Sequence, residues 1–136
     1  MITLRCGDTV LMPRPGVATP HLWIVATEPL ATTSEAILVN VTTLRDHSDT
    51  TLILDVGDHP FIVRKSVIFF DDAQIIDTRK LAAGIQAGFW RQKERCSDYL
   101  IDRIQKALVA SLRTPEKIKI FYRALKSESG IAGSPN

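Results

Sequence analysis

Residues 36–42 read Ala-Ile-Leu-Val-Asn-Val-Thr, an almost unbroken run of aliphatic and β-branched side chains, and this stretch predicts the class of fold. Short runs of this kind are typical of buried β-strands. Similar runs lie on both sides of it, at residues 9–12, 22–27, 50–54, 66–70 and 73–77. Five or six short strands, separated by turn residues rather than by helical periods, predict a small β-barrel or sandwich.

The spacing of the apolar residues changes in the last third of the chain. Leu100, Ile104 and Leu108 recur at four-residue intervals after Ser97, which is a favourable helix N-cap. The segment Thr114-Pro115-Glu116 has the order of cap, proline and acid that starts a second helix. The sequence therefore predicts two consecutive helices that form a hairpin.

These patterns predict a mainly β protein of the α+β class with four segments. Residues 1–82 form the barrel, and residues 83–96 form a basic connector to which no pattern assigns a structure. Residues 97–126 form the helical hairpin, packed on or beside the barrel. Residues 127–136 are rich in Ser, Gly and Pro, and this composition predicts a disordered tail.

The length and composition favour one soluble domain. The chain has 136 residues, of which 45% are hydrophobic, and it contains no apolar run near the roughly 20 residues of a membrane helix. It opens without the pattern of a secretory signal, so we expect a cytoplasmic protein with no membrane partner. Cys6 and Cys96 lie far apart, with no zinc-ligand spacing around them, so we expect free thiols and neither a metal nor a cofactor.

The overall net charge of +2 averages over two unlike halves. Residues 1–78 contain five basic and ten acidic side chains, whereas residues 79–136 contain twelve basic and five acidic ones. Two interpretations stay open. The basic half, in which Phe89 and Trp90 lie among basic residues, can bind nucleic acid, or it can dock on the acidic half.

Several polar residues interrupt the apolar strands and are candidates for chemistry. His21 precedes one strand, Asn40 and Thr42-Thr43 close another, and His59 lies in a turn before Pro60. A histidine can exchange protons near neutral pH, and threonine hydroxyls can donate hydrogen bonds to a phosphate. We interpret the cluster at residues 46–49, Asp-His-Ser-Asp, as a polar turn rather than a catalytic triad.

Four segments together resemble the PemK/MazF family of toxin endoribonucleases. They are Gly7-Asp8-Thr9-Val10, His21-Leu22-Trp23-Ile24-Val25, Val39-Asn40-Val41-Thr42-Thr43 and residues 62–81, and the resemblance spans residues 5–82. It implies an SH3-like barrel that cuts single-stranded RNA without a metal. It also implies a homodimer and an antitoxin protein as partner.

The resemblance also suggests roles for individual residues. Thr42 matches the family's strand-closing hydroxyl, whereas His21 stands where the family has an arginine. A protonated histidine can both transfer a proton and stabilise negative charge, so we assign His21 and Thr42 as the catalytic pair. The candidates for substrate contact are Arg14, Asn40, Thr43 and Arg64.

The missing arginine and the acidic first half leave a second functional hypothesis open. RNA binding depends on Lys and Arg side chains that meet phosphates, and residues 1–78 carry a net charge of −5. The same barrel can instead serve as a non-catalytic protein-interaction module. The two hypotheses differ in whether a cation lies beside His21 and Thr42 in an open groove.

Overall fold

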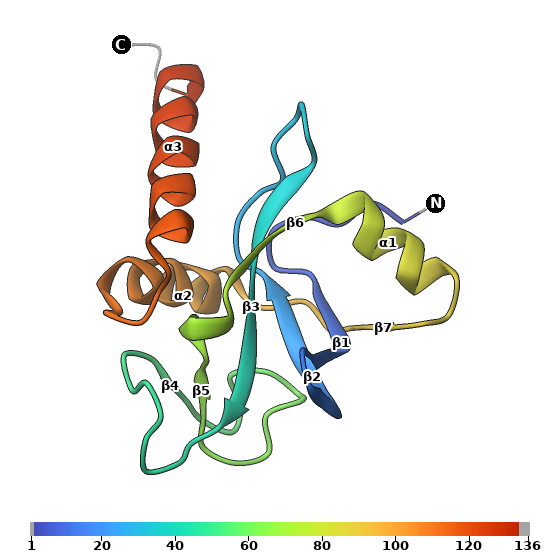
Figure 1. Cartoon of the computed structure of the whole chain (residues 1–136), viewed down its shortest axis with the longest axis vertical. Coiled ribbons are helices and arrows are strands. Elements are labelled where there is room, and N and C mark those ends of the chain that lie inside the picture. The colour runs from blue at the N-terminus through green and yellow to red at the C-terminus, as the bar shows by residue number, and fades with distance from the viewer. Residues whose placement is uncertain (1, 134–136) are drawn as a thin grey trace.

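The computed structural model describes residues 2–133, and side-chain surroundings for residues 2–127. The chain forms an α+β structure, which confirms the predicted class (Figure 1). Its strands are β1 (Thr9–Arg14), β2 (Val17–Val25), β3 (Glu35–Thr43), β4 (Ile53–Leu54), β5 (Ser66–Ile68), β6 (Gln74–Asp77) and β7 (Arg91–Lys93). Its helices are the 3-10 helix η1 (Phe70–Asp72), α1 (Thr78–Gln86), α2 (Asp98–Ala110) and α3 (Glu116–Gly133).

The strands form an antiparallel sheet organised around β3. The sheet order is β4-β5-β3-β2-β1-β7, and β6 pairs with the first half of β3. The apolar stretch at residues 36–42 is thus hydrogen-bonded to three strands, β2, β5 and β6. Within the described part of the chain, β4 and β7 are the two ends of this order and do not pair with each other, so the sheet is not closed into a barrel.

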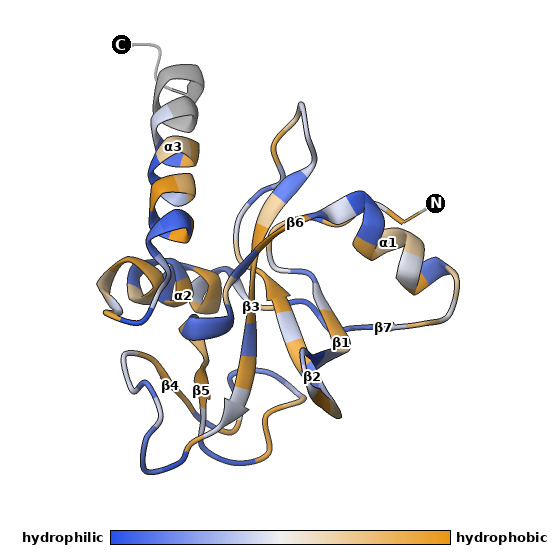
Figure 2. Cartoon of the chain, in the orientation of Figure 1, coloured by the Kyte–Doolittle hydropathy of each residue, from blue (hydrophilic) through white to orange (hydrophobic). Residues whose placement is uncertain are grey.

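Helices cover both faces of the sheet because the strands are apolar on both sides. Leu22 and Ile24 of β2 lie in one buried cluster, whereas Trp23 and Val25 lie in a second cluster with Leu81 of α1. The first cluster also holds Leu100, Ile104 and Leu108 of α2. Successive side chains of a strand point to opposite faces, so α1 and α2 lie on opposite sides of the sheet (Figures 1 and 2).

The structure contains the two predicted helices, but the second helix extends into the segment that we predicted to be a disordered tail. The Ser97 hydroxyl accepts a hydrogen bond from the Leu100 N–H at 3.1 Å, so Ser97 is the N-cap of α2 as expected. Helix α3 continues to Gly133, although we predicted disorder over residues 127–136. Once a helix has formed, each further residue adds a backbone hydrogen bond, and this offsets the weak propensity of Ser and Gly. Residues 134–136 lie outside the described residues.

The predicted connector at residues 83–96 is also structured. Its first residues belong to α1, and Gly88 turns the chain with a φ of 85° into β7. Strand β7 pairs with β1, with Thr9 opposite Lys93. Trp90 packs so closely on Gly84 that a Cβ atom there would lie 2.1 Å from the indole ring. The pairing of β7 brings a basic segment to the edge of the sheet, beside the candidate site.

Candidate functional site

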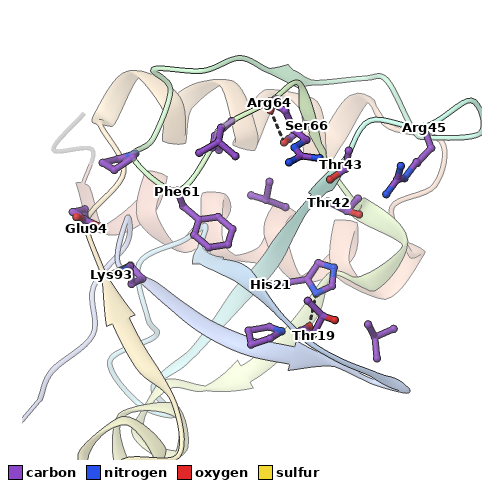
Figure 3. A pocket seen from close by; sticks show the side chains of 16 residues that line it. Thr19, His21, Thr42, Thr43, Arg45, Phe61, Arg64, Ser66, Lys93 and Glu94 are labelled. Carbon is purple, nitrogen blue, oxygen red and sulfur yellow. Dashed lines mark hydrogen bonds between the residues drawn. The ribbon is translucent and has the colours of Figure 1, made fainter.

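An open groove lies where β2 begins and β3 ends, and it has a volume of about 780 Å³. Its other walls are the loop between β4 and β5 and the end of β7 (Figure 3). It is lined by Val17, Thr19, Pro20, His21, Val41, Thr42, Thr43, Arg45, Pro60, Phe61, Ile62, Val63, Arg64, Ser66, Lys93 and Glu94. The groove therefore combines residues from four segments that are far apart in the sequence.

The two predicted catalytic residues, His21 and Thr42, both line this groove. The antiparallel pairing of β2 with β3 runs from Val25–Leu38 to Trp23–Asn40, and His21 and Thr42 lie just beyond the last pair, at the same end of the two strands. His21 is half-buried, and its Nδ1 lies 3.0 Å from the carbonyl oxygen of Thr19. Because this contact uses only Nδ1, the other ring nitrogen, Nε2, can face a ligand.

Three cations also line the groove. They make its local charge positive, although residues 1–78 carry a net charge of −5. Arg45 and Arg64 are exposed and Lys93 is half-buried. None of them has an ion-pair partner among the residues whose side chains are described. Among the described residues of the lining, Glu94 is the one acidic side chain. The groove can therefore attract an anion.

The acidic side chains of the first half do not cancel these cations, because most of them are ion-paired elsewhere. The pairs are Asp8–Arg95, Glu28–Arg5, Asp55–Lys65, Asp58–Arg103, Asp72–Arg14 and Asp77–Arg79. The net charge of −5 that counted against RNA in the sequence is therefore a poor guide to the charge at the groove.

Two of the predicted substrate-contacting residues, Arg14 and Asn40, lie outside the groove lining. The Arg14 Nε is 2.7 Å from the Asp72 carboxylate, and its guanidinium lies 4.6 Å from the centroid of the Phe69 ring. Asn40 is fully buried and donates to the same carboxylate at 3.4 Å. These residues form an internal polar cluster, so their polarity in the sequence reflects packing between β1, β3 and η1.

The other two predicted contacts, Thr43 and Arg64, do line the groove. Arg45, Phe61 and Lys93 also line the groove, although the sequence did not predict them as site residues. No periodic signal marks them, because Arg45 and Phe61 lie in loops and Lys93 reaches the groove only through the pairing of β7 with β1. The one sequence feature that points to this part of the groove is the run of apolar residues before a basic one at residues 61–64.

His59 connects two walls of the groove and does not line it. Only 2% of this residue is exposed, and its Nε2 lies 2.6 Å from the carbonyl oxygen of Glu94. Its Nδ1 accepts a hydrogen bond from the Phe61 N–H at 3.0 Å. One ring nitrogen thus donates and the other accepts, which is the pattern of a neutral imidazole. His59 therefore holds the loop between β4 and β5 against the segment that follows β7.

The segment at residues 46–49 is a polar turn, as interpreted from the sequence. Its Asp49 is buried and accepts hydrogen bonds from the Ser111 hydroxyl and from the amide and hydroxyl of Thr51. Burial raises the pKa of this carboxyl, but these hydrogen bonds and the charge of Arg113 outweigh it, so the pKa is lower than usual. Asp49 thus fixes the turn to the end of α2.

The two cysteines are free and poorly ionised. Cys96 is buried and Cys6 is half-buried. Burial raises the pKa of Cys6 to about 11 and that of Cys96 to about 12, so neither thiol is activated. In the described residues, no group of three or more His, Cys, Asp or Glu side chains is arranged to hold a metal ion.

The fold and the groove define an α+β domain with an open site. This site holds a histidine, two threonine hydroxyls and three cations that form no ion pair with any side chain the structure describes. None of the helices described is long and apolar enough to cross a membrane. Comparison with known protein families gives no matching family, and no curated protein matches the chain. The function is therefore inferred from the groove.

Proposed function

We propose that the groove binds single-stranded RNA and cleaves it without a metal ion. The observation that carries the proposal is that His21 and Thr42 share an open groove with three cations, Arg45, Arg64 and Lys93, that have no acidic partner among the described residues. Phosphate contacts by such cations provide much of the affinity of proteins for nucleic acid.

A single strand suits the groove better than a duplex, because the lining contains both charged and exposed apolar side chains. The exposed Val17, Phe61 and Val63 lie among the cations, and 38% of Phe61 remains accessible. Unpaired bases have apolar faces that such side chains can contact, whereas a duplex presents mainly phosphates and sugars.

The proposed reaction uses the RNA's own hydroxyl as nucleophile. The 2′ oxygen attacks the adjacent phosphorus and the bond from phosphorus to the 5′ oxygen breaks, which leaves a 2′,3′-cyclic phosphate and a 5′-hydroxyl. His21 removes the proton from the 2′-hydroxyl, and water supplies a proton to the leaving oxygen. Arg64 and the Thr42 hydroxyl stabilise the charge that develops on the phosphate oxygens.

The resemblance to the PemK/MazF family supports the same proposal, and we extend it to the fold and the partners. The open sheet of strands β1 to β5 is the part that we compare with an SH3-like barrel. We likewise propose a toxin of a toxin–antitoxin system that acts in the cytoplasm, as a homodimer, with an antitoxin protein as its partner. The cation that the family's arginine would supply comes here from Arg45 and Arg64.

The decisive test incubates the purified protein with end-labelled single-stranded RNA of mixed sequence in the presence of EDTA. We expect fragments ending in 2′,3′-cyclic phosphate. The variant His21→Ala should cut about 100- to 10,000-fold more slowly, because it loses a general base, while its RNA affinity stays near that of the wild type. The exposed His47 lies outside the groove, so His47→Ala is the matched control and should cut like the wild type.

The outcomes separate the two parts of the proposal. RNA that stays intact at an excess of protein and does not bind at low salt refutes RNA as the ligand. RNA that binds to the wild type but is not cut refutes cleavage and the catalytic role of His21. The proposal that the groove binds RNA then stands.

A second candidate function is that of a non-catalytic protein-interaction module. The observation in its favour is the apolar rim of the groove, where Val63 is 71% exposed beside Phe61. An acidic peptide with apolar side chains would fit the same surface. Under this alternative, His21→Ala leaves every activity of the protein unchanged and RNA does not compete with the protein partner.

A further inference from the structure

We propose that Phe61 is a stacking platform that holds one unpaired base of the bound RNA, with phosphates on either side of that base held by Arg64 and Lys93. This inference rests on the proposed RNA-binding function and adds to it the residue that distinguishes a base-bearing strand from a bare chain of phosphates.

The first observation is the position of the Phe61 ring. It lines the groove, 38% of the residue is exposed, and Figure 3 shows the ring projecting from its loop toward the side of the groove on which His21 lies. Large aromatic side chains usually lie in the core, so an accessible ring in a groove that also holds cations suggests a ligand with a flat apolar face.

The second observation is the charge on both sides of the ring. Arg64 lies three residues further along the same loop, and Lys93 lies at the end of β7, next to the segment that His59 joins to this loop. Figure 3 shows Arg64 and Lys93 to either side of the ring. A nucleotide strand alternates flat bases with anionic phosphates, and proteins that bind single strands combine aromatic platforms with a basic groove. The volume of about 780 Å³ lies in the range of sites that enclose a drug-sized ligand, so it can hold a nucleotide.

The third observation is that hydrogen bonds through His59 fix the backbone of Phe61. The Phe61 N–H donates to the buried His59, whose other nitrogen is bonded to the Glu94 carbonyl oxygen. The same carbonyl accepts the Thr9 hydroxyl at 2.8 Å. A platform whose backbone is fixed loses little conformational freedom on binding, which favours affinity.

The test measures binding of two short single-stranded oligonucleotides by fluorescence anisotropy. One is a 2′-O-methyl oligouridylate, which lacks the free hydroxyl needed for cleavage, and the other has the same backbone without bases. The proteins are the wild type, Phe61→Leu and Phe61→Tyr. Phe89→Leu is the matched control, because Phe89 is also an exposed phenylalanine but lies outside the groove.

We expect Phe61→Leu to weaken binding of the base-bearing strand by about 5- to 150-fold and to leave binding of the abasic strand unchanged. Phe61→Tyr should bind like the wild type because it keeps a flat ring, and Phe89→Leu should match the wild type on both strands.

Two results overturn the inference and can be told apart. If Phe61→Leu weakens both strands equally, or neither, the RNA proposal stands and the stacking role is refuted. If the wild type binds neither strand at low salt, the proposed function and the inference that rests on it are both refuted.

Discussion

His59 should stabilise the protein more than its position in a surface loop suggests. The residue is 2% exposed, and its ring joins the Glu94 carbonyl oxygen to the Phe61 N–H at 2.6 and 3.0 Å. Two hydrogen bonds of this kind contribute about 1–3 kcal/mol together, and the cavity left by the ring adds about 1 kcal/mol. We therefore expect His59→Ala to lower the free energy of unfolding by about 2–4 kcal/mol.

Urea denaturation followed by circular dichroism measures this change, with His47→Ala as control because His47 is exposed. His59→Ala should shift the midpoint to lower urea, and His47→Ala should leave it near that of the wild type. The variant should also bind RNA more weakly, since the loop that carries Phe61 is no longer held. If His59→Ala is as stable as His47→Ala, the role of His59 in joining the groove walls is wrong.

Three further predictions concern packing outside the groove. At neutral pH, Asp49→Asn should lower the free energy of unfolding by about 1–3 kcal/mol. Because the pKa of Asp49 in the folded protein lies below the ordinary 3.8, its stabilisation is present above that value and is lost as the pH falls. Urea titrations should therefore show that the free energies of unfolding of the wild type and of Asp49→Asn approach each other in acid. Gly84→Ala should lower the melting temperature, with a loss of about 1–3 kcal/mol, because its Cβ would lie 2.1 Å from Trp90. Cys6 and Cys96, with pKa values raised by burial to about 11 and about 12, should react slowly with a thiol reagent in the native protein and rapidly in urea.

Much of the fold could be predicted from the sequence because the signals are local. The apolar run at residues 36–42 lies in the most extensively paired strand, and the four-residue spacing after Ser97 marks α2. Strand β7 could not be predicted in this way. Its sequence is Arg-Gln-Lys, and it is a strand only because β1 offers an edge for pairing.

The sequence paired His21 with Thr42 only through the family resemblance. Both side chains line the groove because β2 begins and β3 ends there, and the sequence did not predict that these two strands pair. Arg14 and Arg64 look equivalent in the sequence. Asp72 pairs with Arg14, whereas no described residue forms an ion pair with Arg64, and that difference depends on where η1 packs.

The most direct test that the groove binds RNA is the salt dependence of RNA binding. We would measure the affinity for a short single-stranded RNA over a range of salt concentrations, for the wild type and for the double variant Arg45→Ala/Arg64→Ala. The control is Lys80→Ala/Lys117→Ala, which removes the same charge from exposed positions outside the groove. For single strands, each phosphate contact contributes about 0.7 to the slope of log affinity against log salt. We expect the groove variant to bind more weakly with a slope smaller by about 1.4, while the control keeps the slope of the wild type. Equal slopes for the two variants would contradict a role of Arg45 and Arg64 in binding RNA phosphates.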